Sequence, residues 1–132
     1  MRNRRYGIKV NTDWKQTLGS EWRQYEGVFP RLQQSSIDII SLECINSRVP
    51  LELLALIRGK KVMVGAIDVA TNKIESPEEV AAVLREALKY VDADKLYPCT
   101  NCGMAPLSQE VANGKLQALA AGAEIIRKEL GA

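Results

Sequence analysis

Residues 61–91, KVMVGAIDVATNKIESPEEVAAVLREALKYV, decide the class of fold. The first seven residues form an apolar run without helical period, as in a buried parallel strand. Further on, Ser76 can accept hydrogen bonds from free helix amides, Pro77 suits the first helical position, and Glu79 completes a capping box. Apolar residues then recur at helical spacing up to residue 91. The segment predicts a strand followed by an amphipathic helix.

The sequence on either side repeats this alternation. Further strands are expected at three apolar runs, residues 6–10, 37–42 and 95–98. Further helices are expected at residues 20–34, 49–57 and 108–130, with Pro30 kinking or splitting the first and Gly59 near the end of the second. Strands separated by helical crossovers must be parallel. The sequence therefore predicts an α/β fold, either an open sheet covered on both faces or four β/α units forming a partial (half) TIM barrel.

Length and composition restrict the kind of protein. With 132 residues, 46% hydrophobic and 26% charged, the chain is expected to fold as a single domain over residues 1–132. Eighteen basic residues against sixteen acidic ones leave a net charge of +2, which is too balanced to indicate nucleic-acid binding. The sequence lacks the run of about 18 apolar residues that a membrane helix needs. We therefore expect no membrane association and a cytoplasmic location.

The chain contains three cysteines and no histidine. An odd number of cysteines in such a chain favours thiols, metal ligands or buried apolar residues over a disulfide framework. The absence of histidine excludes a Ser-His, Cys-His or histidine-rich metal mechanism carried by this chain alone.

Polar residues follow each of the three central strands. Glu43 and Cys44 follow the first, Asp68 the second, and Cys99 and Cys102 the third. Carboxyl ends of parallel strands share one edge, so two carboxylates and three thiols are expected to converge there. Such a set suits zinc or a thiol substrate. A carboxylate ending a run as apolar as residues 37–42 also requires a metal, a cation or an open cleft.

Each of these residues also has a structural interpretation. Cys44 and Cys99 can be small buried hydrophobes, and Cys102 can simply occupy a turn. Asp68 can stabilise the turn that follows it through its own backbone. Gly65 can allow the close approach of a ligand or form a tight turn.

Several short motifs occur in a characteristic order from about residue 35 onward. They are residues 39–43 (IISLE), 64–69 (VGAIDV), 75–80 (ESPEEV) and 95–97 (KLY), leading into 101–103 (NCG). Together they resemble the C-terminal part of cobalamin-independent methionine synthases, most closely the shorter single-barrel members. The resemblance implies part of a (β/α)-eight barrel in which zinc binds the homocysteine thiolate, which then attacks the methyl group of a methyltetrahydrofolate.

The resemblance also assigns residues. That family holds its metal through a His-x-Cys motif, a glutamate and the cysteine of an Asp-Cys-Gly or similar turn. Glu43 matches the glutamate and Cys102 matches the last cysteine. An ungapped extension puts Met1 and Asn3 at the His-x-Cys positions, so half of the expected zinc ligands are missing.

Three further residues complete this set of expectations. Cys99 or Cys44 would have to substitute as metal ligands if this chain alone binds zinc. Asp68 matches an aspartate of the family and is predicted to be catalytic, although the family's following histidine, a proposed proton donor, is Ala70 here.

The resulting hypothesis is the C-terminal portion of a zinc-dependent S-methyltransferase of methionine biosynthesis, inactive alone. Its expected partners are homocysteine or another thiol and a methyl-folate. A half barrel leaves strand edges and an apolar inner face uncovered, so we also expect a homo-oligomer or a complementary N-terminal half. The alternative is a catalytically silent α/β module that serves assembly or binds a small ligand.

Overall fold

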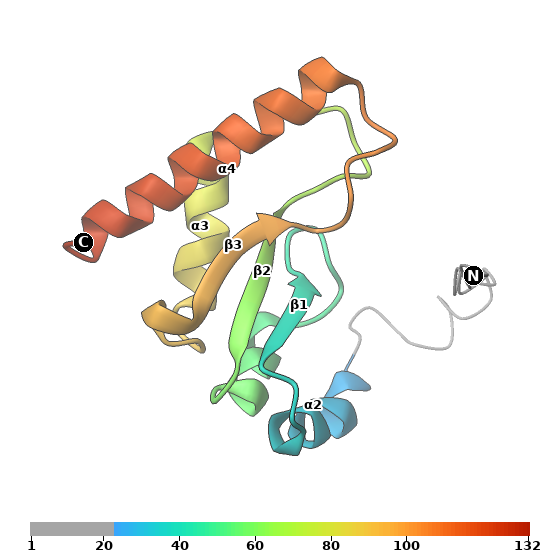
Figure 1. Cartoon of the computed structure of the whole chain (residues 1–132), viewed down its shortest axis with the longest axis vertical. Helices are drawn as coiled ribbons and strands as arrows, with labels where there is room; N and C mark the ends of the chain where they lie inside the picture. Colours follow the sequence, from blue (N-terminus) through green and yellow to red (C-terminus); the bar gives the residue numbers. More distant parts are fainter. Residues whose placement is uncertain (1–22) are drawn as a thin grey trace.

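The computed structural model describes residues 23–132 of the protein (Figure 1). The strand expected at residues 6–10 lies outside this range, as does the beginning of the helix expected at 20–34. In chain order the elements are α2 (Tyr25–Gln34), β1 (Ile39–Glu43), η1 (Leu51–Ile57), β2 (Lys61–Ile67), α3 (Pro77–Ala87), η2 (Ala93–Lys95), β3 (Leu96–Thr100) and α4 (Gln109–Glu129).

The three strands form one parallel sheet in the order β1-β2-β3. The predicted α/β class and the parallel pairing are confirmed. Two strand ends differ from the prediction, because β1 includes Glu43 and β3 continues to Thr100. Cys99 therefore lies inside a strand instead of after it. Pro98 does not end β3, since this strand pairs only with β2 among the described strands and a sheet edge tolerates a proline.

One face of the sheet packs against α3 and α4 (Figure 1). Ile40, Val62 and Val64 are buried on this face. The two helices approach closely at Gly122, where a Cβ atom would lie 2.6 Å from the Cβ of Val80. Small residues on the buried side of α4, among them Ala118 and Ala123, allow this close approach. The sheet and these helices build the hydrophobic core together with residues of α2 and η1.

Two helices differ from their predicted form. α2 runs through Pro30, so the proline does not split it, and the neighbouring Phe29 is buried in the core; the alternative, a kink at Pro30, stays a prediction. The helix expected at residues 49–57 is a 3-10 helix, η1, whose Leu53, Leu54 and Ile57 are buried.

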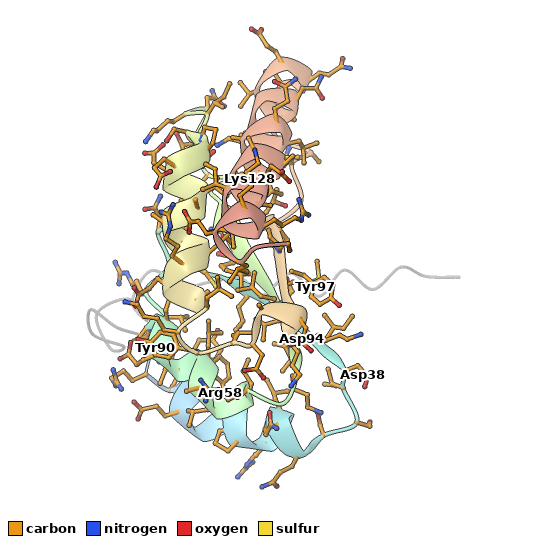
Figure 2. All side chains as sticks on the ribbon, turned by 90° about the vertical axis from the view of Figure 1, so that its left-hand side faces the viewer. Asp38, Arg58, Tyr90, Asp94, Tyr97 and Lys128 are labelled. Atoms are coloured by element: carbon orange, nitrogen blue, oxygen red, sulfur yellow. The ribbon has the colours of Figure 1, made fainter. Side chains whose placement is uncertain are left out.

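The opposite face of the sheet is open in the part of the chain that the structure describes. Ile39, Met63 and Tyr97, one from each strand, are 49%, 37% and 42% exposed. Figure 2 shows Tyr97 on the side of the sheet away from α3. The sheet is therefore not covered by helices on both faces within residues 23–132, and its shape is consistent with part of a barrel. None of the helices in this range combines the length and apolar character that crossing a membrane requires.

Candidate active site

Glu43, Gly65 and Cys99 form one row across the carboxyl-terminal half of the sheet. Glu43 pairs with Gly65, and Gly65 pairs with Cys99. Side chains in register on neighbouring strands share a face, and strands lie about 4.8 Å apart, so roughly 10 Å separates the outer two backbones. The row lies on the open face, where Glu43 is exposed and Cys99 is half-buried. Of the predicted carboxylates and thiols, Glu43 and Cys99 thus share one row and one face of the sheet.

Asn101 ties the ends of all three strands together. Its backbone N–H donates to the carbonyl of Ile67 at 2.9 Å. Its side-chain Nδ2 donates to the carbonyl of Ile45 at 2.9 Å, and its Oδ1 accepts from the N–H of Cys44 at 3.3 Å. The turn after β3 is therefore fastened to the turn after β1.

Gly65 makes room for this connection. A Cβ atom at position 65 would lie 2.8 Å from the carbonyl oxygen of Leu42 and closer still to Oδ1 of Asn101. The pairing of β2 with β3 is irregular between Gly65 and Ile67, as in a β-bulge. Of the two interpretations of Gly65, the structure shows close approach, with protein atoms as the neighbours.

Cys102 follows Asn101 directly and is exposed. The hydroxyl of Thr100 donates to the carbonyl of Cys102 at 2.8 Å, which shapes this short turn. Because β1 and β3 are parallel and flank β2, Glu43 and Cys102 come to the same edge of the sheet. Glu43 also lines an open cavity of about 340 Å³, to which Cys102 does not contribute.

The described residues do not complete a zinc site. Protein zinc sites use at least three protein ligands, usually Cys, His, Asp or Glu. Within residues 23–132, no three side chains of these types lie close enough to hold one metal ion. Glu43 and Cys102 therefore do not fit zinc on their own, and its binding with Cys99 or Cys44 as a substitute stays a prediction.

The three thiols differ in their surroundings. Burial raises the pKa of the Cys44 thiol to about 12, with smaller contributions from Cys99 and Glu43. Cys44 also packs against the core, which agrees with its interpretation as a small apolar residue. Burial raises the pKa of Cys99 as well, partly opposed by a hydrogen bond with Ser41. Cys102 is the exposed thiol of the three.

This difference predicts the order of alkylation by iodoacetamide. Cys102 should react first and Cys44 last, because a pKa of about 12 leaves only about 10⁻⁴ of the Cys44 thiol ionised at pH 8. The rate at Cys44 should rise with pH, since the thiolate is the reactive form. Mass spectrometry of peptides after timed labelling measures each rate, and unfolding in urea should make the three rates similar. Equal labelling of Cys44 and Cys102 in the folded protein at pH 8 would contradict the prediction.

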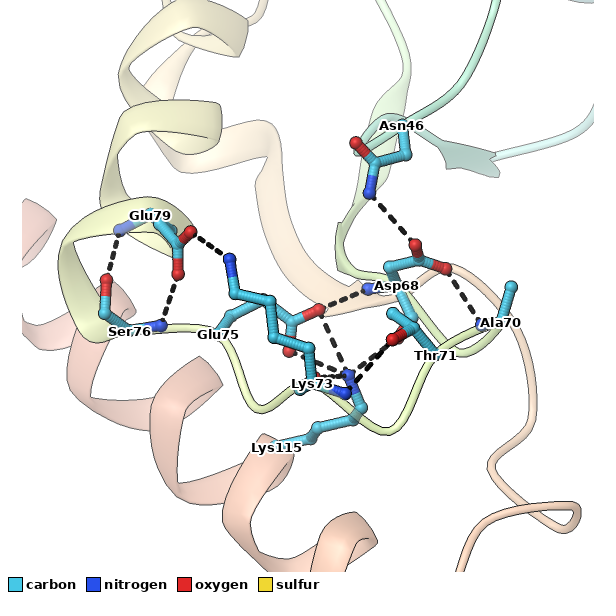
Figure 3. Close-up of polar contacts among 9 residues, drawn as sticks. All are labelled: Asn46, Asp68, Ala70, Thr71, Lys73, Glu75, Ser76, Glu79 and Lys115. Carbon is cyan, nitrogen blue, oxygen red and sulfur yellow. Dashed lines mark hydrogen bonds and ion pairs between the residues drawn. The ribbon is translucent and has the colours of Figure 1, made fainter.

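Asp68 holds the turn after β2 (Figure 3). Its Oδ1 accepts from the N–H of Ala70 at 2.8 Å, and its Oδ2 accepts from Nδ2 of Asn46 at 2.9 Å. These bonds, the one from Ala70 first, lower the pKa of the Asp68 carboxyl, so it is ionised at neutral pH. The turn-stabilising interpretation of Asp68 is thus seen directly, and its catalytic role stays a prediction.

A buried ion pair between Lys115 of α4 and Glu75 lies behind this turn (Figure 3). The Lys115 side chain is 0% exposed and that of Glu75 is 4% exposed. Nζ of Lys115 donates to both carboxylate oxygens of Glu75, at 3.0 and 3.2 Å, to the carbonyl of Asp68 at 2.8 Å and to the carbonyl of Lys73.

The large apolar residues of α4 do not point to this pair, because two of them, Leu116 and Leu130, are exposed. The buried residues of α4 are Lys115, Ala118, Gly122, Ala123 and Ile126. Small residues line the contact between α3 and α4 because the two helix backbones approach closely there. Lys115 lies on the same side of α4 as these small residues. The helical spacing of these small residues was therefore the signal in the sequence that Lys115 lies on the buried side of α4.

The fold and this edge define an α/β protein of the parallel β/α class, in which sites lie at the carboxyl ends of the strands. Residues 10–124 match the family described as "Cobalamin-independent synthase, Catalytic domain". This chain therefore belongs to the cobalamin-independent methionine synthase family.

Individual relatives agree with this assignment. The chain is similar to a methionine synthase of Saccharolobus islandicus (strain Y.G.57.14), with 36% identity over 81% of this chain and 33% of the relative. A methionine synthase of Thermococcus kodakarensis is 35% identical over 61% of this chain and 24% of the relative. The chain therefore spans about a third of the length of the Saccharolobus relative and about a quarter of the length of the Thermococcus relative.

A solved structure is also similar. It is that of a B12-independent methionine synthase from Shewanella sp. W3-18-1 in complex with selenomethionine, with 79% identity and a TM-score of 0.84. The match covers 95% of this chain and 37% of that one.

Proposed function

We propose that this chain is the C-terminal β/α portion, a partial TIM barrel, of an enzyme that transfers a methyl group to the thiol of homocysteine or a similar compound. The methyl donor in this proposal is a methyl-folate. The proposal rests above all on the 79% identity with part of the Shewanella synthase. That protein binds selenomethionine, which carries a methyl group on selenium where methionine carries it on sulfur. A cytoplasmic location and a single domain remain predictions.

Glu43 and Cys102 have defined roles in this proposal. Both lie at the carboxyl edge of the sheet, which is where α/β proteins bind their ligands. We assign them as two ligands of a zinc site whose remaining ligands lie outside residues 23–132. Asp68, ionised and held in the turn that follows the neighbouring strand β2, is the polar residue assigned to the reaction.

The open face of the sheet supports the need for further β/α units. Its exposed Ile39, Met63 and Tyr97 belong to three adjacent strands. Apolar residues of this size on one face favour a covering partner. We propose that activity requires this cover, supplied by a complementary N-terminal half of a synthase, and that without it the chain associates with further copies of itself.

Methyl transfer measured with and without a complement tests the function. The chain is mixed with the part of the Shewanella synthase that it does not match, and methionine formation from homocysteine and a methyl-folate is followed with zinc present. We expect activity in the mixture and none in the chain alone. The Cys102→Ser variant, measured alongside, should lose the activity of the mixture.

Two results would refute the proposal. One is methionine formation by this chain alone at the rate of the mixture. The other is an inactive mixture, with association of the two parts demonstrated, under conditions in which the intact Shewanella protein is active. The second result would favour the alternative, a catalytically silent assembly or ligand-binding module.

Self-association of the isolated chain makes a separate prediction. At micromolar concentration we expect light scattering to give a mass of at least twice 14.6 kDa. Replacing Met63 by lysine should shift the protein toward the monomer, because a charge on the open face must be desolvated in any contact. The matched control is Leu116→Lys, at an exposed position of α4 away from this face. A monomeric parent chain, or equal dissociation by both variants, would contradict the prediction.

A further inference from the structure

We propose that Lys115 is a positioning residue, which holds the turn bearing Asp68 at the carboxyl edge of the sheet. The proposal rests on the function assigned to Asp68 above, and it adds a residue from the last helix to that site. The contacts of the buried ion pair carry it.

The ion pair forms hydrogen bonds with both backbone polar groups of Asp68, its N–H and its carbonyl. Oε1 of Glu75 accepts the N–H of Asp68 at 2.9 Å, and Nζ of Lys115 donates to the carbonyl of the same residue at 2.8 Å. Nζ also binds the carbonyl of Lys73, near the other end of the loop. One ammonium group therefore fastens both ends of the loop between β2 and α3 to α4 (Figure 3).

The side chain of Asp68 depends on this hold. Its carboxylate oxygens reach Ala70 within the turn and Asn46 beyond β1, so their direction follows the orientation of the backbone. Four hydrogen bonds, two to the backbone of Asp68 and two to its carboxylate, therefore fix both the position of its backbone and the direction of its side chain. An apolar core residue at position 115 would fill the same volume without orienting the turn.

The surroundings of Lys115 are shaped for close approach of the loop. Gly114 precedes it, and a Cβ atom there would lie 3.2 Å from Cγ1 of Ile74 and closer to its Cδ1. Glycine at this position allows the loop to rest on α4, so that a lysine side chain reaches carbonyl groups at both ends of the loop.

A double variant separates positioning from simple packing. In Lys115→Met/Glu75→Met both buried charges are absent, and such apolar replacements of buried pairs are often neutral for stability. We expect its melting temperature to stay within roughly 5 °C of the parent chain. We also expect the Asp68 amide to exchange with solvent at least about tenfold faster, because the turn opens locally. The Asp68 carboxyl, followed by NMR, should titrate closer to its ordinary value.

The control is a second double variant on the same two helices. Arg85 of α3 binds Glu129 of α4 at the surface, so Arg85→Met/Glu129→Met removes an ion pair far from the Asp68 turn. It should leave both Asp68 signals as in the parent chain. Neither signal requires methyl transfer, so the inference can fail while the proposed function holds, and the reverse.

Two outcomes would overturn the inference. One is a stable Lys115→Met/Glu75→Met variant with unchanged exchange and titration of Asp68, because Lys115 would then only fill space. The other is a double variant that does not fold, because the pair would then be required by the whole fold and not by the turn.

In the mixture with the Shewanella part, the stable variant should lower kcat more than it changes KM.

Discussion

Replacing Lys115 alone by methionine is expected to lower the free energy of unfolding by about 3–5 kcal/mol, the usual effect of removing one partner of a buried ion pair. The variant leaves the Glu75 carboxylate, which is 4% exposed, without its cation. It also removes the donor that the carbonyls of Asp68 and Lys73 share. Urea denaturation followed by circular dichroism measures the effect.

The matched control is Arg85→Met, which breaks exposed ion pairs with Glu78 and Glu129. Exposed pairs contribute roughly 0–1 kcal/mol, so this variant should remain close to the parent chain. A loss of the same size in both variants would show that burial of the Lys115 charge has no special effect.

Gly65→Ala is expected to cost about 1–3 kcal/mol, because the added methyl group overpacks a buried strand. The group would meet the carbonyl of Leu42 at 2.8 Å, and backbone atoms cannot move aside as a flexible side chain can. It would also displace Asn101, so the turn that carries Cys102 should come loose from the turn after β1. Urea denaturation gives the stability, and hydrogen exchange at the Ile45 and Cys44 amides reports on the local loosening.

Gly27→Ala is the control, for which we expect a change in stability of the opposite sign. Gly27 lies within α2, with open space where its Cβ would be. Alanine in a helix interior is favoured over glycine by about 0.5–1 kcal/mol, so this variant should be slightly more stable than the parent. If Gly65→Ala also proved neutral or stabilising, the close approach of Leu42 and Asn101 to Gly65 would not constrain that position.

Local signals were enough to predict much of the fold. The α3 helix was readable because Ser76, Pro77 and Glu79 act within one turn, and the structure contains the complete capping box. β2 was readable because its continuous apolar run has no helical period, and five of its seven residues are buried in the folded protein. Parallel pairing followed from the helices between the strands. The edge on which Glu43 and Cys102 both lie followed from that pairing.

Contacts between distant segments were not readable in the same way. Three contacts each join residues at least 36 positions apart: the hydrogen bond of Asn101 to Ile45, the packing of Gly65 against Asn101, and the ion pair of Lys115 with Glu75. A lysine in a helix normally lies in solvent, and only the approach of the Asp68 loop to α4 supplies the acceptors that allow its burial. Likewise, β3 continues past Pro98 only because β2 presents a partner for Cys99.

The sequence by itself therefore determined the element types, the parallel sheet and the edge that bears the polar residues, because capping, periodicity and crossover length act within short stretches of chain. Tertiary structure alone decided which polar groups are buried, which thiol is exposed and what holds the Asp68 turn. Those properties depend on desolvation and hydrogen-bond partners, and both are set by residues that come together only when the chain is folded.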